Sequence, residues 1–332
     1  HRSKRGAWFD EKDPVWRLDR NTSVYIGTAN KLLSEDYREG FAKTLAYYAR
    51  NTSPGHTANM AEGIRSLLAA TRSSSINERT LITFRGQLDR FSEYRLGAIR
   101  GFLIRWHELG YPGISSGVME LLQGWTLRGA IKGDAVKRLD PRQGPLTDNE
   151  LQCFNEGAVR VYETRAIDLY RLALCLLQSN TGRRPVQITN LRMGDLDYSA
   201  CERKAQALFT INIPRAKQYG QQFRETTRAF AMTFELWTVV AAHTRECIRD
   251  VERMLGFKLE DRDRLALPIF PNWSKLAQIK TVDDLRRESL SDSLHLQSRE
   301  VTPILKHVAS LANCVSERTG EILQLNARRF RY

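Results

Sequence analysis

The chain has 332 residues, enough for two ordinary domains that each bury a core. Its longest apolar stretches, such as 172–177 and 239–242, are far too short to cross a bilayer, and the charged N-terminus shows no apolar signal-peptide region. The net charge is +13, and the 51 Lys and Arg residues are spread along the whole chain. Composition therefore excludes a membrane-spanning protein and leaves nucleic-acid binding and a merely basic surface as equal alternatives.

The cysteines and histidines do not indicate a disulfide framework or a metal site. The five cysteines show no paired spacing and mostly lie among apolar residues, as buried free thiols do. His243 and Cys247 share a helix face, but no further ligand lies near them in the sequence, so we expect packing rather than zinc binding. No phosphate-binding or dinucleotide-binding glycine pattern and no serine nucleophile elbow occur. These features favour a reducing cytoplasm.

The first half of the chain carries a helical pattern. Residues 1–33 are charged and irregular, and we expect them to form an N-terminal arm. Residues 34–130 have apolar residues at helical spacing and no strand pattern, which predicts a helical domain. Residues 131–146 are polar, basic and interrupted by Gly and Pro, as expected of an interdomain linker. Within the helical domain, helices are expected at 39–50, 58–71, 88–109 and 117–127.

A second domain is expected over residues 147–332. Thr147 and Glu150 form a capping box that begins a helix. Residues 207–213 alternate apolar and polar side chains as a half-buried strand does, and 227–232 are the expected hairpin partner. Helices are expected at 158–178, 234–255, 301–311 and 316–324, with a loop or short turn at 262–272. The pattern predicts a mainly α fold, in which a helical domain precedes a mixed α+β domain with a small β-hairpin.

The string at residues 180–197 is the most informative in the chain. Thr181 and Gly182 are expected to end an apolar helix, and Pro185 to begin a short one, because its missing N–H suits a first helical turn. Arg184 then lies at a helix start, where backbone donors and a guanidinium favour an anion such as phosphate. An ordinary surface arginine is the alternative, and without further context it is the commoner case.

This string resembles the first arginine box of the tyrosine recombinases, the family of the phage integrases. Gln187 stands where the family has an acidic residue, so it can accept a hydrogen bond from a guanidinium but brings no charge. The residues that fit the pattern are Thr181, Gly182, Arg184, Leu191, Arg192 and Asp195.

Two further segments resemble motifs of the same family. Lys217 lies in the polar tip of the expected hairpin, where the family has a lysine that acts as general acid. A solvated turn lysine is the alternative, and Arg215 is a nearby competitor for the role. The terminal segment 325–332 resembles the His-x-x-Arg box, with Arg329 as the second arginine. Asn326 replaces the histidine, so it can donate a hydrogen bond but cannot shuttle a proton.

The resemblance covers about residues 35–332 and implies a C-shaped clamp around double-stranded DNA. It also implies a 3′-phosphotyrosine intermediate, a tetramer on paired DNA sites that can be a monomer without DNA, and no metal or nucleotide cofactor. Arg184 and Arg329 would neutralise the phosphate oxygens, Lys217 would protonate the leaving oxygen, and the protein would be found in the cytoplasm, at the bacterial nucleoid. Further DNA contacts are expected from Arg183, Arg192, Arg215, Lys137, Arg138 and Arg328.

Other interpretations stay open at this point. Gln187 and Asn326 favour a catalytically degenerate relative that binds DNA as an accessory or regulatory protein. An unrelated helical nucleic-acid-binding regulator, with boxes that match by chance, is the other alternative. The family's nucleophilic tyrosine follows the second box by several helical turns, whereas Tyr332 is only three residues past Arg329. We therefore expect the nucleophile beyond residue 332 and expect this chain by itself not to cleave DNA.

Overall fold

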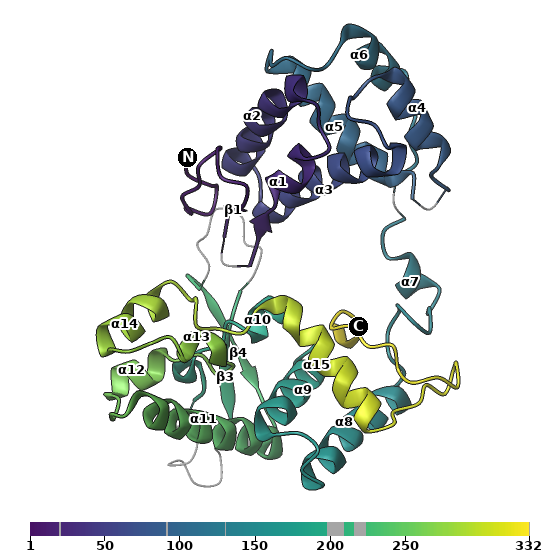
Figure 1. Ribbon diagram of the computed structural model, residues 1–332. Coiled ribbons are helices and arrows are strands. Elements are labelled where there is room, and N and C mark those ends of the chain that lie inside the picture. Colours follow the sequence, from purple (N-terminus) through teal and green to yellow (C-terminus); the bar gives the residue numbers. More distant parts are fainter. Residues whose placement is uncertain (20, 91, 130, 198–208, 216–223, 332) are drawn as a thin grey trace. The chain divides into compact units, whose positions relative to one another are not determined.

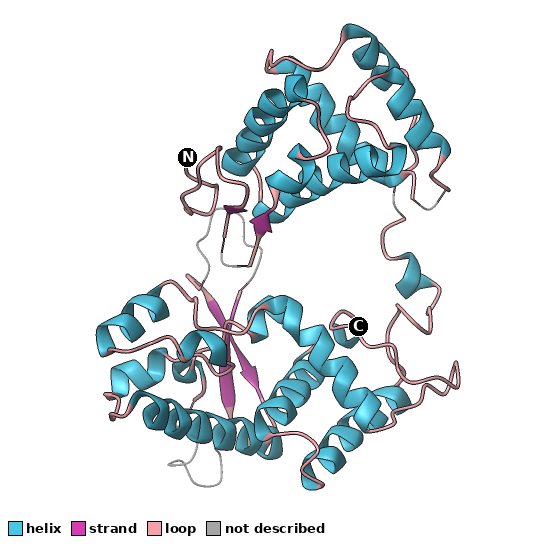
Figure 2. Cartoon of the chain, viewed as in Figure 1, coloured by secondary structure: helices cyan, strands magenta, loops and turns pink. Residues whose placement is uncertain are grey.

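The chain folds into two compact units, each with a hydrophobic core of its own. A computed structural model describes residues 1–332 except 20, 91, 130, 198–208, 216–223 and 332. The first unit is His1–Lys132 and the second is Gly133–Tyr332. The described residues are mainly helical, with two small antiparallel sheets of two strands each (Figure 2). The mainly α fold with a small hairpin is therefore confirmed.

Helices form most of the first unit, and its core lies between α2, α3 and α5. Phe41, Phe102 and Trp106 are fully buried there and contact one another ring to ring. In chain order the elements are β1 (Trp16–Arg17), β2 (Ser23–Val24), α1 (Ile26–Asn30), α2 (Glu35–Asn51), α3 (Pro54–Thr71), α4 (Glu78–Gly86), α5 (Tyr94–Glu108) and α6 (Ser116–Gln123).

The N-terminal residues belong to this unit rather than forming a separate arm. Trp16 and Leu18 are fully buried, and Trp16 pairs with Val24 in the β1–β2 sheet. The few apolar residues of this stretch follow no period, so only tertiary packing shows that they are core residues. The expected helix at 88–109 also differs, because α5 begins at Tyr94 and is preceded by a separate helix, α4, which Asn77 caps through the Thr80 N–H at 2.9 Å.

The second unit begins earlier than expected, because most of the expected linker packs with it. The unit starts at Gly133, residues 134–137 form a short helix, α7, and Gly144 is buried. The other elements, shown in Figure 1, are α8 (Asp148–Glu163), α9 (Leu169–Thr181), α10 (Pro185–Ile188), η1 (Met193–Asp195), β3 (Thr210–Pro214), β4 (Thr227–Ala231), α11 (Phe234–Leu255), α12 (Asp261–Ala266), α13 (Trp273–Leu276), α14 (Val282–Leu290), α15 (Ser298–Leu311) and η3 (Arg329–Arg331).

The core of the second unit surrounds α9, which packs against α8, α11 and α15. β3 and β4 form the expected antiparallel hairpin, with Ile211 opposite Phe230 and Ile213 opposite Arg228. Ile211 and Ile213 face the core, as the alternating pattern predicts. The capping box is also confirmed, because the Thr147 hydroxyl accepts from the Glu150 N–H at 3.1 Å and the Glu150 carboxylate accepts from the Thr147 N–H at 3.3 Å.

Three expectations for this unit were wrong. The apolar run at 158–178 is two helices rather than one, because Asp168 caps α9 through the Arg171 N–H at 2.9 Å after a break at 164–168. The expected loop or short turn at 262–272 overlaps a six-residue helix, α12 (Asp261–Ala266). Residues 316–324 form turns and a bridge between Val315 and Ile322 rather than a helix. None of the helices in the described part of the chain combines the length and the apolar character that a membrane span requires.

Candidate phosphate-binding site at the arginine turn

A sharp turn joins α9 to α10, as the sequence predicts. Gly182 follows α9 with a backbone φ of +58°, and its N–H bonds to the Gln178 carbonyl at 3.1 Å. Arg184 is the extended residue that precedes α10, and Pro185 occupies the first helical position. Because α10 has only four residues, its dipole is small, so affinity for an anion at this turn has to come mainly from arginine side chains.

The C-terminal turn η3 packs directly against this first turn. A Cβ atom added to Gly182 would lie 2.5 Å from the Phe330 carbonyl oxygen and 3.5 Å from the Arg331 Cα. The backbones of residues 182 and 330–331 are therefore in contact, although they are far apart in the sequence. We call residues 181–184 together with 330–331 the arginine turn. Its arginines are Arg183, Arg184 and Arg331.

Gln187 holds the arginine turn against β3. Its side chain is buried, its Oε1 accepts from the Arg184 N–H at 3.3 Å, and its Nε2 donates to the Pro214 carbonyl at 2.7 Å. We expected this side chain to bond a guanidinium, but in the structure the amide joins two backbone segments. A carboxylate at this position has no donor for the Pro214 oxygen. The glutamine is therefore suited to this contact in a way that the family's acidic residue is not.

Arg183 packs against the β3–β4 hairpin at Phe230. Its guanidinium lies 5.6 Å from the centre of the Phe230 ring, and its carbonyl accepts from the Gln178 side chain at 2.8 Å. Both Arg183 and Arg184 are half-buried. A guanidinium over an aromatic face is held in place while it keeps its charge.

Arg329 does not face a phosphate, which corrects its assignment as the second arginine of the site. Its side chain is completely buried. The guanidinium donates to the carbonyls of Gly144 at 2.9 Å, Gln324 at 2.9 Å and Pro141 at 2.8 Å, and it lies 3.3 Å from the Glu150 carboxylate. Burial lowers the pKa of Arg329, and Glu150 acts in the opposite direction. Arg331, two residues on, is exposed.

Asn326 and Arg328, which precede Arg329, also differ: Asn326 makes backbone contacts and Arg328 faces solvent. The Asn326 side chain accepts from the Arg328 N–H at 3.0 Å, and its carbonyl accepts from the Arg329 N–H at 3.0 Å. Asn326 therefore shapes the turn instead of presenting a donor to phosphate. Arg328 is exposed. The spacing of the His-x-x-Arg box singled out Arg329, but the sequence does not show that Arg329 is buried whereas Arg328 and Arg331 are exposed.

Arg192 has a structural partner as well. Its Nη2 lies 2.8 Å from the Asp292 carboxylate, and its N–H donates to Asp195 at 2.7 Å. Burial raises the pKa of Asp292, but His295 and Arg192 lower it further, to well below its ordinary value. Arg192 therefore ties η1 to the end of α14, and we no longer assign it to DNA.

Arg224 is a residue that the sequence analysis missed. Its guanidinium bonds both oxygens of Asp195, at 2.7 and 3.0 Å, and the Asn190 carbonyl at 2.6 Å. It therefore fixes the segment just before β4 to the segment that follows α10. Its place in the sequence, near the hairpin tip, gave no signal for this contact.

The other basic candidates lie at the surface or outside the described residues. Arg215 is exposed at the end of β3, and Lys217 is not among the described residues. Lys137 and Arg138 are exposed on α7, where Arg138 pairs with Asp134 at 2.5 Å. Exposure to solvent is all that the structure shows for Arg215 and Lys137.

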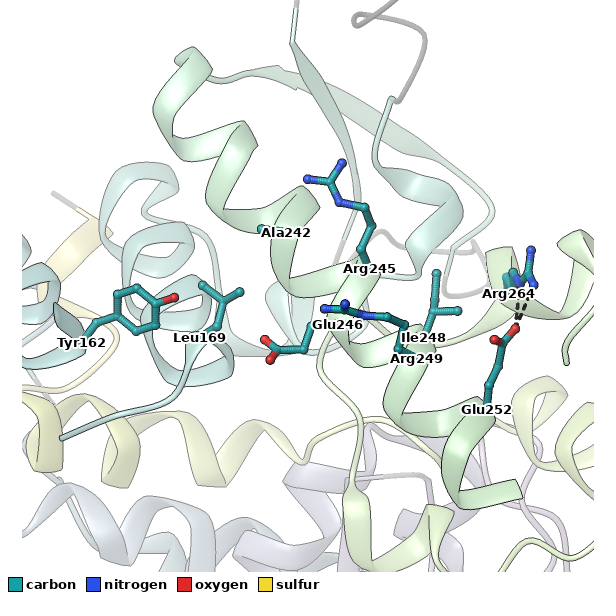
Figure 3. Close-up of a pocket in the computed structure, with 9 residues that line it drawn as sticks. All are labelled: Tyr162, Leu169, Ala242, Arg245, Glu246, Ile248, Arg249, Glu252 and Arg264. Carbon is teal, nitrogen blue, oxygen red and sulfur yellow. Dashed lines mark hydrogen bonds and ion pairs between the residues drawn. The ribbon is translucent and has the colours of Figure 1, made fainter. Parts of the chain in front are cut away.

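A separate pocket lies along α11, and none of its lining residues belongs to the arginine turn. Arg245 and Arg249 line it on one helix face, and the Glu252 carboxylate lies 2.8 Å from Arg264 (Figure 3). Its remaining lining residues are Tyr162, Leu169, Ala242, Glu246 and Ile248. The described residues contain no group of three His, Cys, Asp or Glu side chains that could hold a metal ion.

No protein-family model and no curated protein matches this chain. A function has to be proposed from the arginine turn and its surroundings.

Proposed function

We propose that the protein binds double-stranded DNA and that the arginine turn holds the scissile phosphate of a strand-transfer reaction of the tyrosine-recombinase type. The observation that carries this proposal is the contact of Gly182 with Phe330 and Arg331. It joins the two segments that separately resemble the family's arginine boxes. A chance resemblance gives no reason for the two segments to meet. The net charge of +13 supports a polyanionic partner.

In this proposal Arg184 and Arg331 bind the two non-bridging oxygens of the phosphate. A guanidinium matches phosphate geometry and stabilises the negative charge that builds up in the transition state. Arg331 takes the role that the sequence alone gave to Arg329, because Arg331 is exposed in the turn whereas Arg329 is buried.

The reaction would conserve the phosphoester bond. A tyrosine hydroxyl loses its proton, its oxygen bonds to phosphorus, and the bond from phosphorus to the 5′ oxygen breaks. The 5′ oxygen takes up a proton, for which Lys217 is the proposed donor. No residue of this chain is assigned as the nucleophile. The clamp around DNA, the tetramer on paired sites and the nucleoid location belong to this same proposal.

A DNA-binding accessory protein without catalysis is the second candidate. The structure favours it at two positions, because Gln187 and Asn326 both use their side chains for backbone contacts. Neither then supplies the charge or the proton transfer of the family's acidic and histidine residues. A test for a covalent DNA adduct separates the two candidates.

The first prediction concerns adduct formation by the natural full-length protein on a nicked suicide duplex. The wild-type protein should form a covalent adduct that survives a denaturing gel. Arg184→Ala and Arg331→Ala should each lower the rate by about 100-fold or more, because each removes a charge that binds the transition state. Duplex affinity, measured by fluorescence anisotropy, should fall less than about tenfold, because one phosphate contact is lost among many.

The matched control is Arg253→Ala, which removes an exposed arginine of α11 that pairs with Asp250 and is assigned no DNA contact, and it should leave the adduct rate unchanged. Tight binding by a wild-type protein that forms no adduct would establish the accessory function. Unchanged adduct formation by Arg331→Ala would remove Arg331 from the site.

A further inference from the structure

The buried carboxylate of Glu150, at the start of α8, binds three side chains of the C-terminal segment. Glu150 is only 1% exposed and accepts hydrogen bonds from Ser316, from Arg318 at 2.6 Å and from Arg329 at 3.3 Å. Oε2 of Glu150 also accepts from the Thr147 N–H of its own capping box. Glu150 therefore both begins α8 and holds the segment that leads to η3.

The same two arginines bind the segment that follows α7. Arg318 donates to the carbonyls of Leu139 at 3.1 Å and Pro145 at 2.9 Å. Arg329 donates to those of Pro141 at 2.8 Å and Gly144 at 2.9 Å. We call Glu150, Arg318, Arg329 and these four carbonyls the Glu150 network.

Residues 139–145 are therefore held by side chains of the C-terminal segment. Gly144 allows this close packing, because an added Cβ atom would lie 2.6 Å from the Ala135 carbonyl and 2.7 Å from the Asp140 carbonyl.

The network ends directly beside the arginine turn, because Arg329 immediately precedes Phe330. The Arg329 N–H bonds to the Asn326 carbonyl at 3.0 Å and the Arg331 N–H bonds to the Arg328 carbonyl at 3.1 Å. An anchored Arg329 side chain therefore fixes the backbone that places Phe330 against Gly182 and carries Arg331. Releasing Arg329 would free the backbone of Arg331 from its contact with Gly182.

The charge balance makes this anchor sensitive to Glu150. Two guanidinium groups converge on a single carboxylate, and one of them, Arg329, has no exposed side-chain surface. Removing the negative charge would leave two neighbouring cations, one of them fully buried, without compensation, which is strongly unfavourable. The arrangement therefore depends on Glu150 more than on any single carbonyl contact.

We propose that Glu150 and Arg329 are positioning residues that hold the backbone of Phe330 and Arg331 against Gly182 only while residues 139–145 are seated in the Glu150 network. This inference rests on the proposed function of the arginine turn. Residues 139–145 come shortly after the junction of the two units at Lys132 and Gly133. A change in this segment would thereby reach the phosphate site.

The first arm of the test uses hydrogen–deuterium exchange and needs no DNA. Glu150→Gln and Arg329→Lys should accelerate exchange about tenfold in peptides that span 139–145 and 324–331, because both segments lose a shared anchor. Peptides from α11 should be unchanged. The control is Glu317→Gln, since Glu317 contacts Thr147 and Asn149 at the same end of α8 but is exposed. Unchanged exchange in both segments would overturn the network.

The second arm measures single-turnover adduct formation by the full-length protein. Glu150→Gln and Arg329→Lys should lower the rate about tenfold or more, with the final amplitude and the duplex affinity close to wild type. Partial unfolding would instead lower the amplitude, because it removes active molecules without slowing the rest, and that result would overturn the positioning role. Glu317→Gln should react at the wild-type rate. If the wild-type protein forms no adduct, the proposed function fails, and the exchange arm still decides whether the network holds the turn.

Discussion

At the residue scale, burial decides which of the C-terminal arginines has a structural role and which faces solvent. Arg328, Arg329 and Arg331 follow one another almost directly in the chain, yet only Arg329 is buried with three carbonyl partners and a carboxylate. Arg184 could be singled out from the sequence, because Gly182 and Pro185 are local signals that define the turn around it. The second arginine could not, because its burial depends on Glu150 and on Pro141 and Gly144.

The second prediction tests whether glutamine is required at position 187. Gln187→Glu should lower the free energy of unfolding at pH 7 by about 2 kcal/mol, because a buried carboxylate would face the Pro214 carbonyl oxygen instead of donating to it. The new carboxyl has a raised pKa in the folded state, so its destabilising effect is present at neutral pH and is relieved as the pH falls and the group protonates. Urea unfolding at pH 7 and pH 5 measures both effects.

Gln187→Met is the control for size, since it can neither donate nor carry charge. It should destabilise the protein at both pH values by the same amount. A glutamate variant as stable as wild type at pH 7 would show that the Gln187–Pro214 bond is unimportant.

At the element scale, the contact between the α9–α10 turn and η3 requires a glycine. Gly182 combines a positive φ of +58° with a neighbour, the Phe330 oxygen, that leaves no space for a Cβ atom. Gly256 ends α11 in the same left-handed conformation, with φ +77°, but a Cβ atom there would meet nothing within 4 Å. Gly256 is therefore needed only for its left-handed backbone, whereas Gly182 is needed for its backbone and for the space that a Cβ atom would take.

The third prediction compares alanine at these two positions. Gly256→Ala should cost about 1 kcal/mol, which is the cost of a left-handed backbone for a residue with a Cβ atom. Gly182→Ala should cost more, by about 2 kcal/mol, because the turn and η3 must also move apart. Urea unfolding of both variants measures the difference. Equal losses would mean that η3 does not pack tightly on the turn.

The fourth prediction concerns the junction of α11 and α12. Burial raises the pKa of Glu252, but the Leu259 N–H, Lys258 and Arg264 lower it more, to about 2. Since this folded pKa is below the unfolded value of about 4.3, the carboxylate stabilises the fold at neutral pH. That stabilisation should decline as the pH falls from about 4.3 through about 2.

Glu252→Gln should therefore be less stable than wild type at pH 7 and equally stable near pH 2, as measured by urea unfolding. Glu246→Gln, at an exposed position of the same helix, should follow the wild-type curve. A constant difference between Glu252→Gln and wild type across this range would show that the carboxylate is not the stabilising group.

At the scale of the whole molecule, the division of the chain differs from the one that composition indicates. The Gly- and Pro-containing stretch 131–146 has the composition of a linker, but from Gly133 onward it packs with the second unit. The side chains of Arg318 and Arg329 satisfy its carbonyls. A segment whose backbone is hydrogen-bonded in this way is protected, so the exposed junction is shorter than the sequence suggests.

The fifth prediction is that limited trypsin digestion cuts first after Arg128 or Lys132, both of which are exposed. Arg142 is also exposed but lies within the held segment and pairs with Glu321 at 3.0 Å, so it should be cut later. Mass spectrometry of the early fragments identifies the sites. First cleavage after Arg142 would contradict a segment held by the Glu150 network. If the network holds the segment, Glu150→Gln should make cleavage after Arg142 earlier than in the wild-type protein.

The sequence by itself determined the features that local chemistry controls. The capping box at Thr147 and Glu150 and the turn at Gly182 depend on residues within a few positions of one another, and α11 and the β3–β4 hairpin follow from periodic patterns in continuous segments of the chain. Tertiary structure alone decided that residues 1–33 complete the first core, that η3 packs on Gly182, and that Arg331 rather than Arg329 is exposed there. These outcomes depend on contacts between distant segments, and no local pattern records whether a given arginine will find a buried carboxylate and free carbonyls when the chain folds.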